Sequence, residues 1–246
     1  ETGVVSRTGT PLRGNVYFIF QDSGHNLWIA TKGEGLVKAE PQGEMRYKLT
    51  RYQHRKDDIY SLSDDNVYCA YEDDKGRIWV ATFGGGINYL TRDRDGKEMF
   101  VNHRNNLKGF PIDKCHKVRF ITGDHQGNIW IATTVGALMV NGSFKNPEDA
   151  VFHHYLRVQD DMYSLSNNDV HWILSTRKKE LYLATFGGGL NKLLSVNADG
   201  HARFRSYCVE DGLPSDILLS IREDKKQNLW MSTENGITCF HTKEKI

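Results

Sequence analysis

Short apolar runs alternate with polar turns along the whole chain. Between residues 66 and 103 the runs NVYCAYE, IWVAT, INYL and MFVNH are separated by the turns DDKG and GGG and by a longer polar stretch. Aromatic and β-branched residues favour strands, whereas Asp and Gly favour tight turns. This stretch therefore predicts four short strands joined by turns, which is typical of one blade of a β-propeller.

The same pattern occurs five times. Its most regular member is an aromatic residue in the second run of each repeat, and these residues are spaced by 51, 51, 52 and 48 positions. They are Trp28, Trp79, Trp130, Tyr182 and Trp230. A near-constant period of this length indicates a repeat protein. We predict an all-β fold, a β-propeller of about five four-stranded blades, with residues 1–246 as a single propeller domain or a fragment of one. The approximate blades are residues 15–56, 66–104, 117–156, 169–207 and 216–246.

Two further positions recur ahead of the aromatic residue. An Asp lies six residues before it in four repeats, as at Asp73 and Asp124, and a Gly lies three residues before it at Gly76 and Gly127. We predict structural roles for these residues, and for the aromatic residues a packing role between blades, because a sugar-stacking platform would not be copied into every repeat. The fourth repeat departs from this pattern with Thr176 and Lys179, and the fifth has Gln227 in place of Gly, which leaves the turn geometry of those two repeats open.

The glycine runs at 84–86 and 187–189 raise the question of a phosphate-binding loop. Such a loop needs a Lys and a hydroxyl residue after the glycines and a helix that follows. Here Ile87, Asn88 and Tyr89 follow, between two predicted strands. We therefore predict that the glycines serve the backbone of a turn, where positive φ or close backbone approach is required.

Composition excludes several classes of function. Lys plus Arg is 32 and Asp plus Glu is 31, a formal net charge of +1, so no nucleic-acid partner is expected. No apolar run approaches the roughly 20 residues of a membrane span, and no membrane contact is expected of this segment. The histidines are scattered and no EF-hand spacing occurs, so we expect no metal and no cofactor. The four cysteines form no CxxC pair. We expect buried free thiols, and a disulfide between distant segments stays possible if the chain is exported.

The string DHQGNIWIAT at 124–133, the turn GGGL at 187–190 and the segment LPSDIL at 213–218 resemble the two-component regulator propeller repeat. The resemblance extends over all five units. It implies the periplasmic sensor region of a hybrid two-component sensor histidine kinase, the extracytoplasmic part of an inner-membrane protein. Many such kinases of Gram-negative bacteria regulate glycan use, so the resemblance implies an oligosaccharide ligand, a possible homodimer through the sensor, and no catalysis by this chain.

Such sensors usually contain more than five blades. We therefore favour an arc of a larger propeller over a closed five-bladed ring. The chain ends in a predicted third strand at 236–240, and residues 3–7 are a possible fourth strand that would complete the last blade and close the ring.

Candidate binding residues are those that the repeat does not dictate. The position after the first-strand Val varies among the repeats, and the loops that lead into the first strands are expected at the same end of the blades as the glycine turns. The candidate ligand-binding residues are Tyr17, Tyr68, Phe83, Arg119, His171, Trp172 and Phe186. The alternative is that several of them only fill the central channel.

Two other functions remain open. A carbohydrate-active propeller enzyme would use two carboxylates. The acidic pairs 57–58, 64–65 and 160–161 are available, but the first and last recur at matching positions, which favours turn roles, and we expect no catalytic residue. The other alternative is a structural or dimerisation module of the sensor, with ligand bound elsewhere.

Overall fold

A computed structural model describes residues 14–43 and 46–241; the possible closing strand at 3–7 lies outside them. The described residues form nineteen strands, the helical turn α1 (Ile112–Cys115) and the 3-10 turns η1 (Pro147–Asp149) and η2 (Val209–Asp211). Within this part of the chain no helix is both long and apolar enough to cross a membrane. The predicted all-β class is confirmed.

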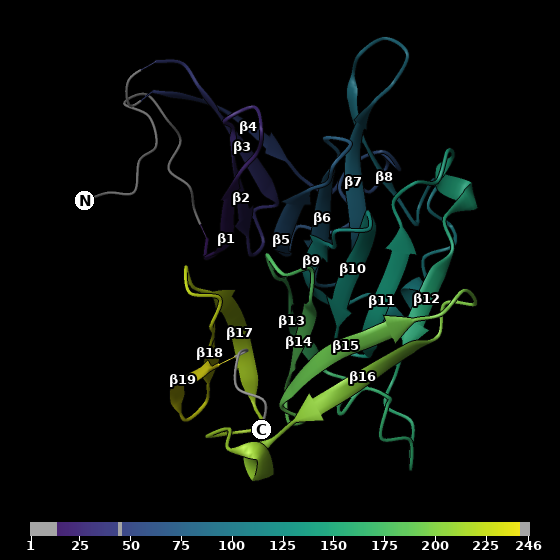
Figure 1. Ribbon diagram of the computed structural model, residues 1–246. Helices are drawn as coiled ribbons and strands as arrows, with labels where there is room; N and C mark the ends of the chain where they lie inside the picture. The colour runs from purple at the N-terminus through teal and green to yellow at the C-terminus, as the bar shows by residue number, and fades with distance from the viewer. Residues whose placement is uncertain (1–13, 44–45, 242–246) are drawn as a thin grey trace. The chain divides into compact units, whose positions relative to one another are not determined.

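The strands form five antiparallel sheets in which spatial order follows chain order (Figure 1). The first sheet contains β1 (Val16–Gln21), β2 (Leu27–Thr31), β3 (Leu36–Pro41) and β4 (Tyr47–Tyr52). The second contains β5 (Val67–Glu72), β6 (Ile78–Thr82), β7 (Gly86–Arg92) and β8 (Glu98–Asn102). The third contains β9 (Val118–Gly123), β10 (Asn128–Thr133), β11 (Gly136–Asn141) and β12 (Phe152–Tyr155). The fourth contains β13 (Val170–Ser175), β14 (Leu181–Thr185), β15 (Leu190–Val196) and β16 (Ala202–Tyr207). The fifth contains β17 (Leu218–Glu223), β18 (Leu229–Thr233) and β19 (Gly236–Phe240).

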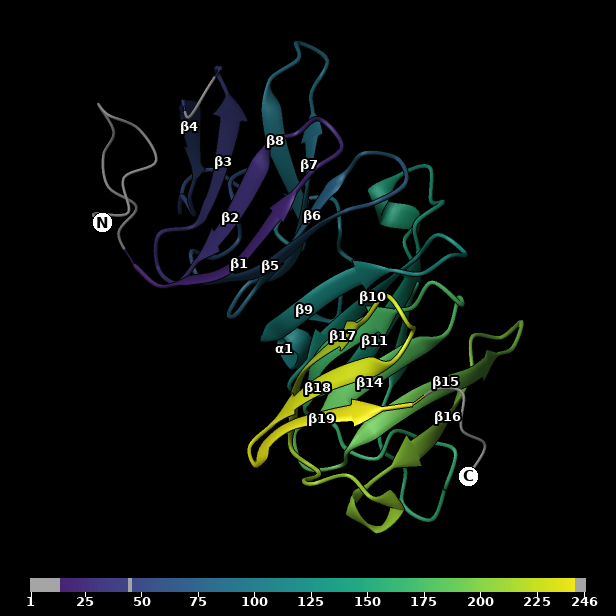
Figure 2. The same cartoon turned by 60° about the vertical axis from the view of Figure 1, so that its left-hand side comes forward.

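The chain divides into two compact units. The first unit comprises the described residues up to 118 together with 145–149, and it holds the first two blades. The second unit comprises 119–144 and the described residues from 150 onward, and it holds the other three. In the first unit β5 contacts both β1 and β2 (Figure 2). In the second unit β13 contacts β10 and β17 in the same manner, so that within each unit one sheet packs its face on the next.

Apolar layers between neighbouring sheets form the core. In the first unit Trp28 and Leu36 of the first sheet pack with Val67 and Val80 of the second, and Leu62 from the connecting loop is completely buried among them. In the second unit Leu218 and Met231 of the fifth sheet pack against Tyr182 and Leu190 of the fourth. Because no sheet can bury its apolar face alone, each blade depends on its neighbour.

The repeated aromatic residues are buried in four of the five blades. Trp28, Trp79, Trp130 and Tyr182 are at most 2% exposed. Trp230 differs, with 46% of its surface exposed. Trp28 faces the sheet that follows its own, whereas among the described residues no sheet follows the fifth in the chain.

The repeated Asp connects the first turn of a blade to its core. In the second blade Asp73 Oδ2 accepts a hydrogen bond from the Trp79 indole at 2.8 Å, and Oδ1 accepts the backbone N–H groups of Lys75 and Arg77 at 3.0 and 2.9 Å. The Asp–indole bond recurs in the first, third and fifth blades at 2.7, 2.8 and 3.0 Å. In the fourth blade the Thr176 hydroxyl accepts the backbone N–H of Glu180, and Glu180 accepts the Tyr182 hydroxyl at 3.0 Å, so two residues replace one.

The turn backbone is the same in all five blades. Three residues before the aromatic position, φ is 65° at His25, 72° at Gly76, 77° at Gly127, 65° at Lys179 and 70° at Gln227. The exchanges of Gly for Lys and Gln therefore leave the turn geometry unchanged, although a residue with a Cβ is less stable in this left-handed conformation than Gly.

Replacing Asp73 by Ala is expected to lower the free energy of unfolding by about 2–3 kcal/mol, because a buried indole N–H and two turn N–H groups lose their acceptor. Urea unfolding measures the loss. The exposed neighbour gives the control, since Asp74→Ala should change stability by no more than about 0.5 kcal/mol. Equal effects of the two substitutions would contradict the role assigned to Asp73.

Replacing His25 by Gly is expected to raise the free energy of unfolding by about 0.5–1 kcal/mol, because relief of the left-handed conformation outweighs the entropy lost with Gly. The reverse exchange, Gly76→His, should lower it by a similar amount. A Cβ at Gly76 would meet only the Glu72 carboxylate, at 4.0 Å, so conformation rather than a clash decides this result. Thermal unfolding of both variants measures these two changes. A G76H variant more stable than the original chain would contradict the explanation.

Candidate functional site

The glycine turns fasten each blade to the loop that leads into the next. The N–H groups of Gly84 and Gly86 both donate to the carbonyl of His116 at 3.0 Å. Those of Gly187 and Gly189 donate to the carbonyl of Asp216 at 3.0 and 2.8 Å. Gly189 has φ of 72°, and a Cβ there would lie 2.1 Å from the Tyr207 carbonyl oxygen. The glycines therefore serve the backbone, and they bring the lead-in loops to the end of the blades where the turns lie.

A buried Asn holds the lead-in loop of its own blade in the second and fourth repeats. Asn88 Oδ1 accepts the Ser63 backbone N–H at 3.0 Å and Asn88 Nδ2 donates to the Ser63 hydroxyl at 2.8 Å. Asn191 makes the same two bonds to Ser166, at 3.0 and 2.7 Å. The loops are thus fixed on rigid strands, as a preorganised binding surface requires.

The variable first-strand positions are β-bulges. The pairing of first and second strands skips one residue in four blades, and the skipped residues are Tyr17, Tyr68, His171 and Leu219. A bulge bends the strand and turns its extra side chain away from the regular alternation. The residues that vary from repeat to repeat are therefore those whose side chains leave the regular alternation of the strand.

In the first unit these positions form a row of aromatic rings. The ring centroids of Tyr17 and Tyr68 are 4.5 Å apart, and Tyr68 stacks on Phe83 at 4.7 Å with an interplanar angle of 13°. Lys117 Nζ lies 5.7 Å from the centre of the Phe83 ring. Tyr17 is exposed and the other two rings are half-buried, so the row offers aromatic edges and faces to solvent.

In the second unit the equivalent positions form a polar group. Arg119 binds Asp169 through two bonds, Nε to Oδ1 at 2.9 Å and Nη2 to Oδ2 at 3.0 Å. His171 stacks on the exposed ring of Phe186, with the ring centroids 5.1 Å apart. This arrangement combines an aromatic face with charged donors and acceptors held in a fixed geometry.

His171 has an unusual environment within this group. Its Nε2 atom is buried, lies 3.9 Å from Asp169 Oδ1, and has no hydrogen-bond partner among the described residues. Burial lowers the pKa of His171 below its usual value, and the nearby Arg119 guanidinium lowers it further, against the opposing effect of Asp169. The imidazole is therefore neutral at neutral pH and can donate or accept a hydrogen bond.

Trp172 lies apart from the other candidates. It follows the bulge residue His171 on β13 and pairs with Ala184 of β14. Its ring stacks on Phe120 at a centroid distance of 3.9 Å, and the Arg222 guanidinium lies 4.4 Å from its ring centre. This environment is a packing layer between strands β9, β13 and β17.

Two residues of these groups, Lys117 and Asp169, were not among the sequence candidates. Both occupy the position just before the first-strand Val, which reads Asn15, Asn66, Lys117, Asp169 and Ile217 in the five repeats. That position varies as strongly as the one after the Val, so the same comparison of repeats would have found them.

The acidic pairs of the lead-in loops cap turns. Asp58 accepts the Tyr60 N–H at 3.0 Å, Asp64 accepts the Asn66 N–H at 2.7 Å, and Asp161 accepts the Tyr163 N–H at 2.9 Å. The bonds of Asp58 and Asp161 explain why the pairs 57–58 and 160–161 recur. Within the described ranges no group of three or more His, Cys, Asp or Glu side chains is placed to hold a metal ion.

All four cysteines are free thiols. Cys69 and Cys115 are buried, whereas Cys208 and Cys239 are half-buried.

Residues 61–84, which run from the second lead-in loop through the Asp turn to the first glycine turn, match the family described as "Two component regulator propeller". The match covers part of one of the five repeats. No curated protein sequence matches this propeller-repeat chain significantly.

Solved structures resemble the propeller-repeat chain at low sequence identity. One is the extracellular domain of a protein described as the hybrid two-component system BT3049 from B. thetaiotaomicron, with a TM-score of 0.67 and 22% identity over 96% of this chain and 28% of that one. Another is the extracellular domain of BT4673 from the same organism, with a TM-score of 0.71 and 19% identity over 97% and 31%. A virginiamycin B lyase from Staphylococcus aureus has a TM-score of 0.61 and 16% identity over 93% and 70%. At these identities the likeness shows the fold, and the chain spans less than a third of the two sensor structures.

The His171 environment predicts a pH dependence. A histidine with a depressed pKa binds protons less readily in the folded than in the unfolded chain, so the free energy of unfolding should fall as pH drops through the unfolded value of about 6.5. His171→Gln should reduce this fall, and Arg119→Ala should raise the pKa of His171 while burial keeps it below the usual value. NMR titration of the imidazole measures the shift. The exposed His201→Gln is the control, and a His171 pKa at or above the usual value would refute the assignment.

Proposed function

We propose that this chain is part of the periplasmic sensor region of a hybrid two-component sensor histidine kinase, and that the glycine-turn ends of its blades bind an oligosaccharide. The repeat family and the sensor domains with a similar fold support the first part. In this proposal the chain binds its ligand and performs no chemistry, and it forms part of an extracytoplasmic region of an inner-membrane protein.

One observation supports the binding site: the first-strand positions that differ among the repeats lie at β-bulges, and they carry side chains suited to sugar binding. Tyr68, Phe83 and Tyr17 provide contiguous ring surface, which suits the C–H faces of a pyranose. In the second unit His171 Nε2 is an unused polar atom beside the Arg119–Asp169 pair, which suits hydroxyl groups. Aromatic surface with a few fixed polar groups is typical of small-molecule sites.

Signal transfer in this proposal follows from a difference in affinity. A ligand shifts an equilibrium between two arrangements of the sensor only by the difference between its binding free energies for the two. The proposal includes a homodimer of the sensor, in which the ligand favours one arrangement of the two copies.

Calorimetric titration of the chain with a panel of plant, host and microbial oligosaccharides tests the proposal, with products followed by chromatography. We expect binding without cleavage, and we expect Tyr68→Ala or Phe186→Ala to weaken it about tenfold or more, equivalent to about 1.4 kcal/mol. Ile237→Ala, at an exposed residue of β19, should leave the affinity unchanged.

Each other outcome selects a different function. Cleavage of a bound sugar would favour the carbohydrate-active enzyme, and some proteins of this fold are lyases. Failure of every sugar to bind would contradict the oligosaccharide assignment and favour a structural or dimerisation module.

A further inference from the structure

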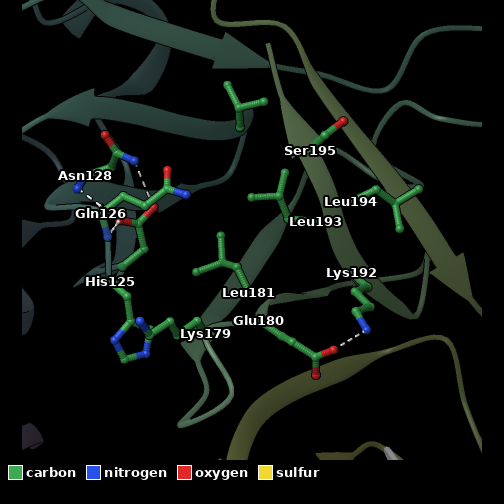
Figure 3. Close-up of a pocket in the computed structure, with 12 residues that line it drawn as sticks. His125, Gln126, Asn128, Lys179, Glu180, Leu181, Lys192, Leu193, Leu194 and Ser195 are labelled. Carbon is green, nitrogen blue, oxygen red and sulfur yellow. Dashed lines mark hydrogen bonds and ion pairs between the residues drawn. The ribbon is translucent and has the colours of Figure 1, made fainter. Parts of the chain in front are cut away.

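A cavity of about 650 Å³ lies in the second unit, between the third and fourth blades (Figure 3). We call it the junction pocket. It is formed by the first turn of the third blade and by strands β14 and β15 of the fourth. In an up-and-down sheet this turn and the glycine turn lie at opposite ends of the strands, so the junction pocket is separate from the candidate site described above.

The two walls of the junction pocket differ in character. One wall is polar, with His125, Gln126 and Asn128 from the first turn of the third blade. The other is apolar, with Leu193 and Leu194 from β15, and Leu181 lies between the two walls (Figure 3).

An ion pair closes one end of the junction pocket. Lys192 Nζ lies 2.5 Å from Glu180 Oε1, and Glu180 Oε2 accepts the Tyr182 hydroxyl at 3.0 Å. The side chains of Lys192 and Glu180 are both partly exposed, so both remain within reach of a ligand. Because their charges cancel, the pair favours a neutral ligand over an anion.

The junction pocket arises where the fourth repeat departs from the others. The segment that follows the glycine turn reads INYLTRDRDG in the second repeat and LNKLLSVNADG in the fourth, which has one additional residue. The pairing of β15 with β16 skips Leu194, whereas β7 and β8 pair without a break. The insertion is therefore a β-bulge at Leu194, and this apolar side chain is 49% exposed at the pocket. Bulges that turn a side chain outward are frequent at functional sites.

The equivalent place in the first unit shows what the departure changes. Between the first and second blades the cavity measures about 360 Å³. There Arg77 binds Asp73 and lies over the Trp79 ring, and Arg92 pairs with Glu98 at 3.4 Å. In the fourth blade Glu180 stands in the place of Arg77, and the bulge brings Val196 to the place of Arg92, so neither of these two arginines has a counterpart at the junction pocket.

We propose that the junction pocket binds a neutral saccharide of one or two rings. Each hydroxyl group is both a donor and an acceptor, whereas an ammonium only donates and a carboxylate only accepts, so one sugar hydroxyl can accept from Lys192 and donate to Glu180. The aliphatic wall fits the C–H face of a ring, and the side-chain amide of Gln126 on the polar wall can bond its other hydroxyls. Small-molecule pockets span roughly 300–1,000 Å³. The inference rests on the proposed function for its ligand class alone.

Methyl NMR of the whole chain, labelled at Leu and Val, tests the proposal. The probes are glucose, maltose, cellobiose, lactose and xylobiose, each titrated to millimolar concentration, with glucuronate as the anionic comparison. At least one neutral sugar should give saturable shifts of the Leu181, Leu193, Leu194 and Val196 methyl groups. Lys192→Met and Leu194→Glu should each raise its Kd about tenfold or more. Thr91→Ala, at the equivalent strand of the first unit, should leave it unchanged.

The outcomes separate this proposal from the function proposed above. Shifts confined to Leu219, at the glycine-turn end, would support that function and overturn the junction pocket. Pocket shifts that persist in a Phe186→Ala variant support the junction pocket whether or not the glycine-turn end binds sugar. The proposal is overturned if the methyl groups of the pocket do not shift with any of the five neutral sugars, or if they shift with glucuronate alone. Retained methyl spectra in both pocket variants show that lost binding does not come from lost folding.

Discussion

The bond between a turn carboxylate and a core indole is the interaction on which each regular blade depends. One Asp side chain accepts turn N–H groups with one oxygen and the tryptophan N–H with the other, as Asp73 does with Trp79. The bond fixes where the second strand begins and how its largest side chain enters the core. A buried polar group is costly unless it is paired, so the Asp and the Trp require one another. In the fifth blade, where the indole is exposed, the hydrogen bond from Trp230 lowers the pKa of Asp224 to about 2, because the bond favours the charged carboxylate.

This fixed framework leaves a few positions free to differ. The glycine turns and the buried Asn residues determine where each lead-in loop lies, and the bulge in the first strand presents one side chain outside the regular pattern. The same backbone position can therefore carry Tyr68 in one blade and His171 in another without disturbing the core. Through the same first-strand bulge, the first unit carries an aromatic row and the second unit carries a group with charged side chains and an imidazole.

The fourth repeat illustrates how a blade tolerates the loss of the main interaction. Thr176 and Glu180 share the tasks of the missing Asp, and Lys179 adopts the left-handed conformation that Gly holds elsewhere. With the smaller ring of Tyr182 and the extra residue at Leu194, the blade keeps its fold, but its junction holds a cavity of about 650 Å³ where that of the first unit holds about 360 Å³. The junction pocket thus lies at the repeat that departs most from the common pattern.

The sequence by itself determined the all-β class, the strands, the five blades and the turn role of the glycines, because strand and turn preferences are local and the period of about 50 residues repeats them. It also identified the variable positions, since five copies within one chain can be compared with one another. Only the tertiary structure decided that Tyr17, Tyr68 and Phe83 stack in one row while Trp172 points into a packing layer, because a bulge changes the alternation of side chains between adjacent residues. Only it showed that Trp230 is exposed and that the junction pocket is open, because burial depends on how side chains pack between neighbouring strands and sheets, and strand and turn preferences hold no information about that packing.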